Sequence, residues 1–415
     1  MRIIAISTLI SACIFVHWIP TAAAQEAPAG TTAKDAKEYK VSSTLAGIPV
    51  VLLKGNHYER GYAHGRILKD HILDVVDNYI LAKTHPMLYL AMLRNLGKRL
   101  VVDKGLEEEA KGMLKGAEDA AGGKFQSAKL PEPFTWRDLL ALNTYIDYVG
   151  TNCSSVSAWG DATKNASTQG KPVLVRNLDW SLHRALLRNQ VVFVSIPTEE
   201  GLLPMVNVGF AGFMGCLSCI NKEGVGAFLN LGYSNRSGSF PPAYPFTPSA
   251  LALRKAVEES GAKGEKEPLS RFLKTLTDTK RTGSFIIHAV APQNGDKDPA
   301  MVIELASNKH GWRDASHDEK IEANYLIATN HNRVMNAPKE CRRYAAAREF
   351  AVASKDEGVT LDSMWQLLST IKRSDTMQSI LFVPSTGEFW LAVRSGKDGK
   401  MTDKEKTNLK KLFGF

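Results

Sequence analysis

The stretch NCSSVSAWGD (152–161), followed after a turn by VLVRNLDW (173–180), is the part of this chain that predicts its fold. Small and apolar residues alternate in the first run, a polar turn with lysine, asparagine and glycine follows, and a β-branched run returns. This pattern predicts a β-hairpin. Cys153 opens the first strand, and Arg176 and Asp179 close the second. Antiparallel pairing therefore brings these three residues to one end of the hairpin.

A thiol beside a guanidinium group and a carboxylate can be reactive. The cation stabilises the thiolate and lowers the pKa of the thiol, and the thiolate is the nucleophilic form. A buried, inert thiol beside a strand-end ion pair is the structural alternative. Ser154 and Ser155 add hydroxyl groups, but neither lies in a Gly-x-Ser-x-Gly elbow.

The N-terminal region has the pattern of a secretory signal: a positive charge at Arg2, an apolar run, and small residues ending at Ala24. We expect cleavage after Ala24 (signal 1–24), a disordered leader over 25–40, and a periplasmic or secreted protein without a transmembrane anchor. The segment ISAC (10–13) resembles a lipoprotein signal, but apolar residues continue after Cys13, which favours cleavage without a lipid.

Composition narrows the class of protein. The 415 residues suffice for one large domain or two. The formal net charge is +9, but basic and acidic residues are interspersed, and no basic stripe alternates with aromatic residues. The sequence therefore gives no sign of nucleic-acid binding.

Four cysteines follow the predicted signal, namely Cys153, Cys216, Cys219 and Cys341. Cys216 and Cys219 have the spacing of a redox motif, but their surroundings indicate a strand, and residues three apart on a strand point to opposite faces. We expect these two to be small buried hydrophobes, with a disulfide to Cys341 as a minor alternative.

Helical patterns precede Cys153, and mostly strands follow it. A strand at 48–53 leads to helices at 67–82, 86–100, 106–121 and 135–148. We expect His64 to pack or cap at the start of the first helix, with a catalytic role as the alternative. After Cys153, short strands surround a helical block, which predicts stacked antiparallel sheets covered by helices, an α+β fold. The strands are expected at 153–162, 172–180, 191–196, 205–208, 216–221, 226–231, 284–291, 301–305, 325–329, 379–384 and 388–394, and the helices at 248–260, 269–278, 339–353 and 361–371.

The hairpin resembles that of the N-terminal-nucleophile (Ntn) hydrolases of the choloylglycine hydrolase, acid ceramidase and isopenicillin-N acyltransferase group, especially the acyltransferase-like C45 branch. Cys153, SAWG (157–160) and RNLDW (176–180) carry the resemblance. Weaker matches are GYAHG (61–65), NKEGV (221–225) with Asn230, ATNH (328–331) with Asn330, and RRY (342–344) with Arg343. The resemblance implies a four-layer αββα sandwich, with 41–152 as a mainly helical pro-segment and 153–415 as the catalytic segment.

The resemblance also implies self-cleavage between Asn152 and Cys153, which would leave a heterodimer of the two fragments. Cys153 would then be both nucleophile and base, since a free α-amino group has a pKa of about 7.7–8.0. Its implied supporting residues are Arg176 for the thiolate, Asp179 to orient the α-amino group, the Asn230 main-chain amide and the Asn330 side chain for the oxyanion, and Arg343 for the pocket.

The expected function is an exported cysteine amidase or acyltransferase that cleaves an acyl–nitrogen bond of a small-molecule amide through a thioester on Cys153, without a cofactor or metal. Two alternatives remain: a non-catalytic envelope protein that binds an acyl ligand, and an uncleaved hydrolase that uses His64 or His331 as its base. The acyl group and the amine are not specified by the sequence. Loop 233–244 is expected to line the pocket.

Overall fold

The computed structural model describes residues 41–149, 152–165, 167–232, 244–307, 309–315, 324–336, 340–395 and 399–414. The predicted signal peptide and leader, and loop residues 233–243, lie outside the described residues.

Two β-sheets form the centre of the molecule. The first has nine strands in the order β1-β2-β5-β6-β7-β8-β9-β10-β11, and the second has seven, ordered β12-β3-β4-β13-β14-β15 with β16 also paired to β14. Their bounds are β1 Val41–Leu45, β2 Ile48–Gly55, β3 Asn152–Ala158, β4 Val173–Asp179, β5 Gln190–Pro197, β6 Met205–Phe210, β7 Ser218–Asn221, β8 Gly226–Leu231, β9 Phe285–Val290, β10 Ala300–Leu305, β11 His310–Arg313, β12 Tyr325–Ala328, β13 Thr376–Val383, β14 Glu388–Ser395, β15 Lys400–Met401 and β16 Glu405–Asn408.

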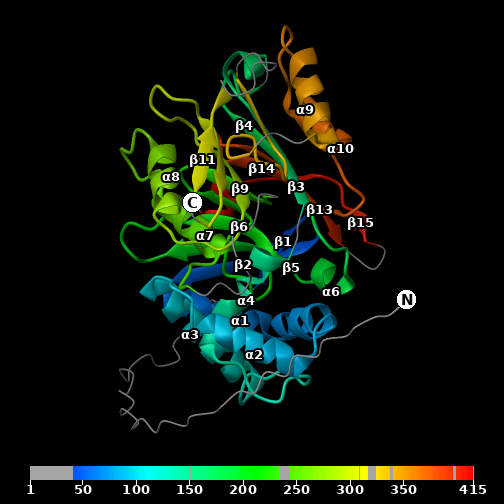
Figure 1. The fold of residues 1–415 in the computed structure, drawn as a ribbon. Helices are drawn as coiled ribbons and strands as arrows, with labels where there is room; N and C mark the ends of the chain where they lie inside the picture. The colour runs from blue at the N-terminus through cyan, green and yellow to red at the C-terminus, as the bar shows by residue number, and fades with distance from the viewer. Residues whose placement is uncertain are drawn as a thin grey trace, which may run out of the picture. The chain divides into compact units, whose positions relative to one another are not determined.

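Helices cover the outer face of each sheet (Figure 1). They are α1 His57–Val75, the π-helix η1 Val76–Ile80, α2 Pro86–Gly97, α3 Lys104–Ala121, α4 Trp136–Leu142, α5 Tyr145–Tyr148, the 3-10 helix η2 Gly160–Thr163, α6 Arg184–Arg188, α7 Ser249–Glu259, α8 Pro268–Thr277, α9 Arg342–Ala353, α10 Leu361–Thr370 and α11 Leu409–Phe413. None of the helices in the described ranges is both long and apolar enough to cross a membrane.

Three hydrophobic clusters define the layers. One lies between the sheets and joins Val192 and Phe228 of the nine-stranded sheet to Leu174 and Phe382 of the other. A second packs α9 and α10 on the outer face of the seven-stranded sheet, and a third packs the remaining large helices on the nine-stranded sheet. The prediction of two stacked sheets covered by helices is therefore confirmed.

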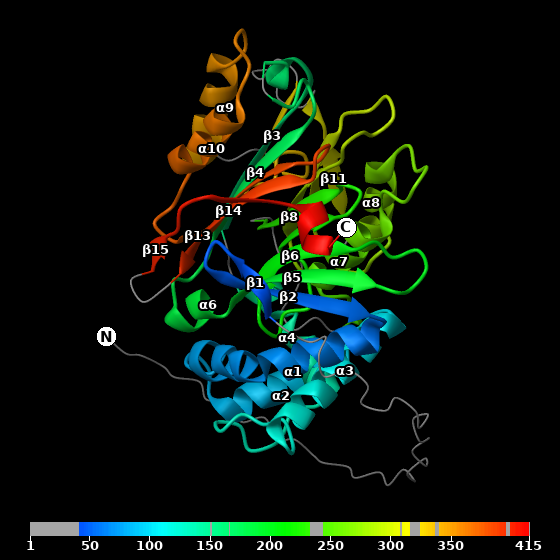
Figure 2. The ribbon, with the colours of Figure 1, turned by 180° about the vertical axis from the view of Figure 1, so that it is seen from behind.

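The segment before Cys153 is built into the main sheet. β1 and β2 form its edge, and β2 pairs in parallel with β5 (Figure 2). This parallel pair differs from the predicted all-antiparallel sheets, because the chain between β2 and β5 crosses back through several helices. The Asn152–Cys153 bond therefore lies, along the chain, between two strands that pair with each other in one sheet.

Helix α1 begins at His57, well before the predicted start at residue 67. Asn56 caps it, in a capping box with Glu59. Gly61 and Gly65 lie inside the helix, where an added Cβ would overlap a carbonyl oxygen of α3, that of Glu109 or Met113. These glycines therefore mark the close approach of two helices and not a loop.

Other boundaries also shift. The predicted helix at 135–148 is two helices, α4 and α5, and the predicted strand at 153–162 ends at Ala158 and gives way to η2. The lysine-rich C-terminal region follows the last predicted strand, at 388–394. It contributes β16 and α11 and packs Leu409 and Phe413 into the cluster between the sheets. Apolar residues in a charged segment were the signal for this packing.

Candidate active site

The register of the predicted hairpin sets the geometry of the site. In the antiparallel pair β3–β4, Cys153 lies opposite Leu178, Ser155 opposite Arg176, and Asn152 opposite Asp179. Alternate residues of a strand face opposite sides of a sheet. Cys153 and Arg176 are therefore on the inner face, toward the nine-stranded sheet, and Asp179 is on the outer face, toward α9.

The thiol of Cys153 is held by a guanidinium group. Arg176 Nη2 lies 3.3 Å from Cys153 Sγ and also donates to the Leu229 carbonyl oxygen at 2.8 Å, while Nη1 donates to the Ser218 hydroxyl. Both Cys153 and Arg176 are 0% exposed. Burial raises the pKa of the Cys153 thiol, and the Arg176 charge and a main-chain hydrogen bond from Asp179 oppose that rise.

Among the described residues, the hydrogen-bond partners of buried Arg176 are neutral: a hydroxyl, a carbonyl and the thiol. A buried charge without a counter-ion is costly. Deprotonation of Cys153 would supply that counter-ion, which is why the Arg176 charge lowers the pKa of the thiol against the larger effect of burial.

The main chain of Cys153 is held as closely as its side chain. Its N–H donates to Asn330 Oδ1 at 3.0 Å, and its carbonyl accepts from Arg343 Nη1 at 2.7 Å. Arg343 Nη2 also donates to Asn330 Oδ1, at 2.8 Å. Because Oδ1 accepts two donors, Asn330 Nδ2 points the other way, to the Leu231 carbonyl at 2.7 Å.

Asp179 completes the outer face. Its carboxylate accepts from Arg343 Nη1 at 2.9 Å and from the Thr376 hydroxyl at 2.6 Å, and burial raises its pKa to about 6. In the uncleaved chain the Cys153 N–H donates to Asn330, so the Asp179 carboxylate is linked to Cys153 through Arg343. The role predicted for Asp179, orienting a free α-amino group, applies to the cleaved form and stays a prediction.

Asn230 differs from its predicted role. Successive residues of an antiparallel strand turn their N–H and C=O groups to alternate sides. Leu229 turns its groups toward Leu217 and Arg176, so Asn230 turns its own toward its partner Ile286 on β9. The expected oxyanion amide thus points away from Arg176. The Asn230 side chain lies instead beside Ser155, with Nδ2 3.4 Å from the hydroxyl oxygen.

Sequence reasoning missed His288. This β9 residue is fully buried between two serines of β3, with Nδ1 3.0 Å from the Ser155 hydroxyl and Nε2 2.8 Å from that of Ser157. Burial, with the nearby Arg313, lowers its pKa to about 3, so the imidazole is neutral. The residues around His288 in β9 are apolar, and its contacts with Ser155 and Ser157 depend on how the two sheets pack, which no local pattern predicts.

His64, considered as a base, has a packing role. It lies inside α1, contacts the ring of Phe193 at 4.8 Å between centroids, and accepts from the Gly212 N–H at Nε2. Burial lowers its pKa to about 4. The other histidine considered, His331, directly follows Asn330. Within the described ranges, no cluster of three His, Cys, Asp or Glu side chains could hold a metal ion.

The two cysteines expected as separate buried thiols are joined. Cys216 and Cys219 form a disulfide, while Cys153 and Cys341 are free. The prediction failed because β7 begins only at Ser218, so Cys216 precedes the strand and the alternation rule does not apply to the pair.

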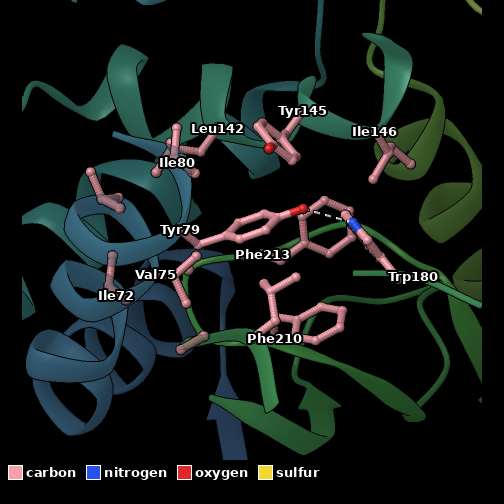
Figure 3. A pocket seen from close by; sticks show the side chains of 14 residues that line it. Ile72, Val75, Tyr79, Ile80, Leu142, Tyr145, Ile146, Trp180, Phe210 and Phe213 are labelled. Atoms are coloured by element: carbon pink, nitrogen blue, oxygen red, sulfur yellow. Dashed lines mark hydrogen bonds between the residues drawn. The ribbon is translucent and has the colours of Figure 1, made fainter. Parts of the chain in front are cut away.

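An apolar pocket adjoins the end of β4 (Figure 3). Trp180, the residue after Asp179, donates through Nε1 to the hydroxyl of Tyr79 at 3.0 Å. Tyr79 belongs to the π-helix η1, an irregularity frequent at functional sites. The cavity is about 50 Å³ and combines residues from both sides of the Asn152–Cys153 bond: Ile72, Val75, Val76, Tyr79, Ile80, Leu142, Tyr145, Ile146, Trp180, Leu186, Phe210, Ala211, Gly212 and Phe213.

No protein-family model matches the sequence. Among solved structures, the chain is similar to an amidase, a hydrolase and an acylase. The first is a Caenorhabditis elegans ortholog of N-acylethanolamine-hydrolyzing acid amidase (17% identity, 56% of this chain and 93% of that chain, TM-score 0.41). The others are a mutant of the conjugated bile acid hydrolase of Clostridium perfringens (10%, 62% and 93%, 0.38) and penicillin V acylase of Agrobacterium tumefaciens (10%, 62% and 87%, 0.38).

In sequence, the chain is 24% identical over 216 residues to protein dcd1B of Dictyostelium discoideum. That match covers 49% of this chain and 39% of dcd1B, so the chain spans well under half the length of this relative.

Proposed function

We propose that this chain is an exported, self-processing cysteine amidohydrolase or acyltransferase of the Ntn type, with Cys153 as its nucleophile. The observation that carries the proposal is the set of contacts to this one residue. Arg176 holds its thiol, Asn330 its N–H, and Arg343 its carbonyl. Such contacts fix both the side chain and the nitrogen that a cysteine nucleophile needs as its base.

Processing would come first, because a peptide nitrogen is not basic. The Cys153 sulfur attacks the Asn152 carbonyl carbon, the C–N bond breaks, and the nitrogen takes up a proton. Water then hydrolyses the thioester, which leaves a carboxyl group on Asn152 and a free α-amino group and thiol on Cys153.

In the substrate reaction, the α-amino group accepts the thiol proton and the sulfur attacks the acyl carbon of the amide. Arg176 stabilises the thiolate. We assign the oxyanion to Asn330 Nδ2, which must first leave the Leu231 carbonyl that it contacts in the uncleaved chain. The protonated amine leaves, and water or another amine takes the acyl group from the thioester.

The acyl group would occupy the pocket beside Trp180. Its lining is almost entirely apolar, which suits hydrocarbon, and its volume of about 50 Å³ admits only a short apolar group unless the pocket widens on binding. Because both sides of the processing bond contribute residues, the two fragments would have to stay together to bind substrate.

An oxidising compartment suits the chain. The Cys216–Cys219 disulfide is of a kind that persists in exported proteins and is rare in the reducing cytosol. Together with the signal-like sequence at 1–24, it supports a periplasmic or secreted location.

A trapped acyl group is the test. Full-length protein is mixed with p-nitrophenyl esters of different acyl chains, and peptides are mapped by mass spectrometry. We expect acylation of the Cys153 peptide, its loss in Cys153→Ala, and its retention in the matched control Cys341→Ser. Acylation that survives Cys153→Ala would contradict the proposal. An acyl chain that binds without any acylation would instead support the non-catalytic envelope protein.

A further inference from the structure

The disulfide encloses a short loop, Cys216-Leu217-Ser218-Cys219, at the start of β7. Its first cysteine is anchored to α7 by a hydrogen bond from the Cys216 N–H to the Ala250 carbonyl at 2.9 Å. The preceding N–H groups, of Met214 and Gly215, both donate to Asn143 Oδ1. The loop is therefore fixed at its base as well as across its ends.

This loop controls both oxygen atoms that bind Arg176. Ser218, inside the loop, accepts directly from Arg176 Nη1. Leu217, also inside the loop, accepts from the Leu229 N–H at 3.0 Å, and the Leu229 carbonyl accepts from Arg176 Nη2. The same Nη2 contacts the thiol of Cys153.

Burial makes these contacts hard to replace. Cys216 and Cys219 are 0% exposed and Ser218 is 2% exposed. Water has no access to take the place of a lost hydroxyl, so the guanidinium group would lose a partner outright.

We propose that the Cys216–Cys219 loop is a positioning element for the nucleophile, and that Ser218 is a positioning residue that holds the Arg176 guanidinium against the Cys153 thiol. The disulfide fixes the loop, the loop fixes the two oxygens, and the two oxygens fix the cation. The inference rests on the proposed function only in taking Cys153 as the nucleophile.

In the uncleaved chain three charged groups act on the thiol, and only one of them depends on the loop; after cleavage the α-amino group of Cys153 would be a fourth, and it does not contact the loop. Arg176 favours the thiolate, as does Arg343 of α9, while Asp179 of β4 opposes it. Arg343 and Asp179 hold each other on the outer face of the hairpin. Loss of the Ser218 hydroxyl would therefore shift one cation and leave the other two groups in place.

The test is the pH dependence of Cys153 alkylation by iodoacetamide in the full chain, followed by peptide mass mapping so that Cys341 does not interfere. Ser218→Ala should move the midpoint upward by about one pH unit. The double variant Cys216→Ala/Cys219→Ala should move it in the same direction. Ser218→Thr keeps the hydroxyl and should restore the wild-type midpoint.

Ser195→Ala is the matched control. Ser195 is buried in β5 of the same sheet, and its hydroxyl has no hydrogen-bond partner among the described residues. The midpoint of Cys153 alkylation in Ser195→Ala should equal that of the wild type. An unchanged midpoint in Ser218→Ala would overturn the inference, as would a wild-type thiol that does not react at any pH.

The assay separates this inference from the proposed function, because alkylation needs no substrate. A shifted midpoint without acylation of Cys153 would leave the loop's role intact and refute the enzyme. Acylation of Cys153 with an unshifted midpoint in Ser218→Ala would support the enzyme and refute the loop's role. Since Ser218→Ala leaves the disulfide closed, it remains informative even if the double variant does not fold.

Discussion

An arginine lies on each face of hairpin β3–β4, Arg176 of β4 on the inner face and Arg343 of α9 on the outer face, and the two differ in what neutralises their charge. On the inner face, buried Arg176 binds a hydroxyl, a carbonyl and the Cys153 thiol. On the outer face, Arg343 is paired with the Asp179 carboxylate at 2.9 Å. The charge of Arg176 is therefore not neutralised by a carboxylate and can act on the Cys153 sulfur. The Arg343–Asp179 pair is formally neutral, and its arginine donates to the main-chain carbonyl of Cys153.

The largest loss of activity is expected when the Cys153 sulfur is removed. Cys153→Ala should lower kcat/KM by at least about 10⁴-fold, the scale seen when a nucleophile is removed from a catalytic set. Amide hydrolysis by the purified full chain measures this. The control Cys341→Ser should stay near wild type. Residual activity within about tenfold of wild type in Cys153→Ala would place the chemistry elsewhere.

Substitution of the two arginines should have the next largest effects on kcat, and the two effects should differ. Arg176→Gln removes the uncompensated charge and should cost about 10²–10³-fold in kcat, comparable to loss of a main transition-state contact. Arg343→Gln should cost less, about tenfold, because its charge is shared with Asp179. Parallel kinetics, with thermal melts to exclude unfolding, give the comparison. A greater loss for Arg343→Gln would reverse the assignment of the two faces.

Asp179 makes the outer face sensitive to pH. Its carboxyl is protonated as pH falls through about 6, which weakens the pair with Arg343. Activity should fall severalfold on the acid side with an apparent pKa near 6, and Asp179→Asn should abolish that acid limb. A variant that keeps the limb unchanged would show that another group titrates there.

The same shift predicts a change in stability. The pKa of Asp179 in the fold lies above its ordinary value of 3.8, so its stabilising contribution is present below that value and lost as pH rises through about 6. Relative to wild type, Asp179→Asn should thus be more stable at about pH 8 than at about pH 4. The difference should be on the order of 2–3 kcal/mol by denaturant unfolding, and an equal effect at both pH values would refute it.

The smallest effect on activity is expected for a substitution at Ser157, farther along the inner face of the hairpin. Ser157 contacts the neutral His288, which carries no charge to the thiol. Ser157→Ala should cost about 1 kcal/mol of unfolding free energy and change kcat by less than about threefold. Activity and denaturant unfolding on one preparation measure both. A loss of activity as large as that of Arg176→Gln would show that the neutral cluster takes part in the chemistry.

The hairpin and its end residues could be predicted from the sequence because both rest on local alternation, and the register then brings Cys153 near Arg176. Ser218 could not be predicted, because it reaches Arg176 from another sheet. Gly61 and Gly65 fell outside the predicted helix at 67–82, because the contact with α3 that explains them is not local. The direction of the Asn230 amide depends on its ladder with β9, which no motif specifies.

The most direct measurement is N-terminal sequencing, with intact mass, of the full chain purified after expression with its own N-terminal region, beside Cys153→Ala. Wild type should give two fragments that copurify, the larger beginning at Cys153, and the variant should stay uncut at that bond. Wild-type protein that hydrolyses amides at full rate with the Asn152–Cys153 bond intact would contradict the central claim.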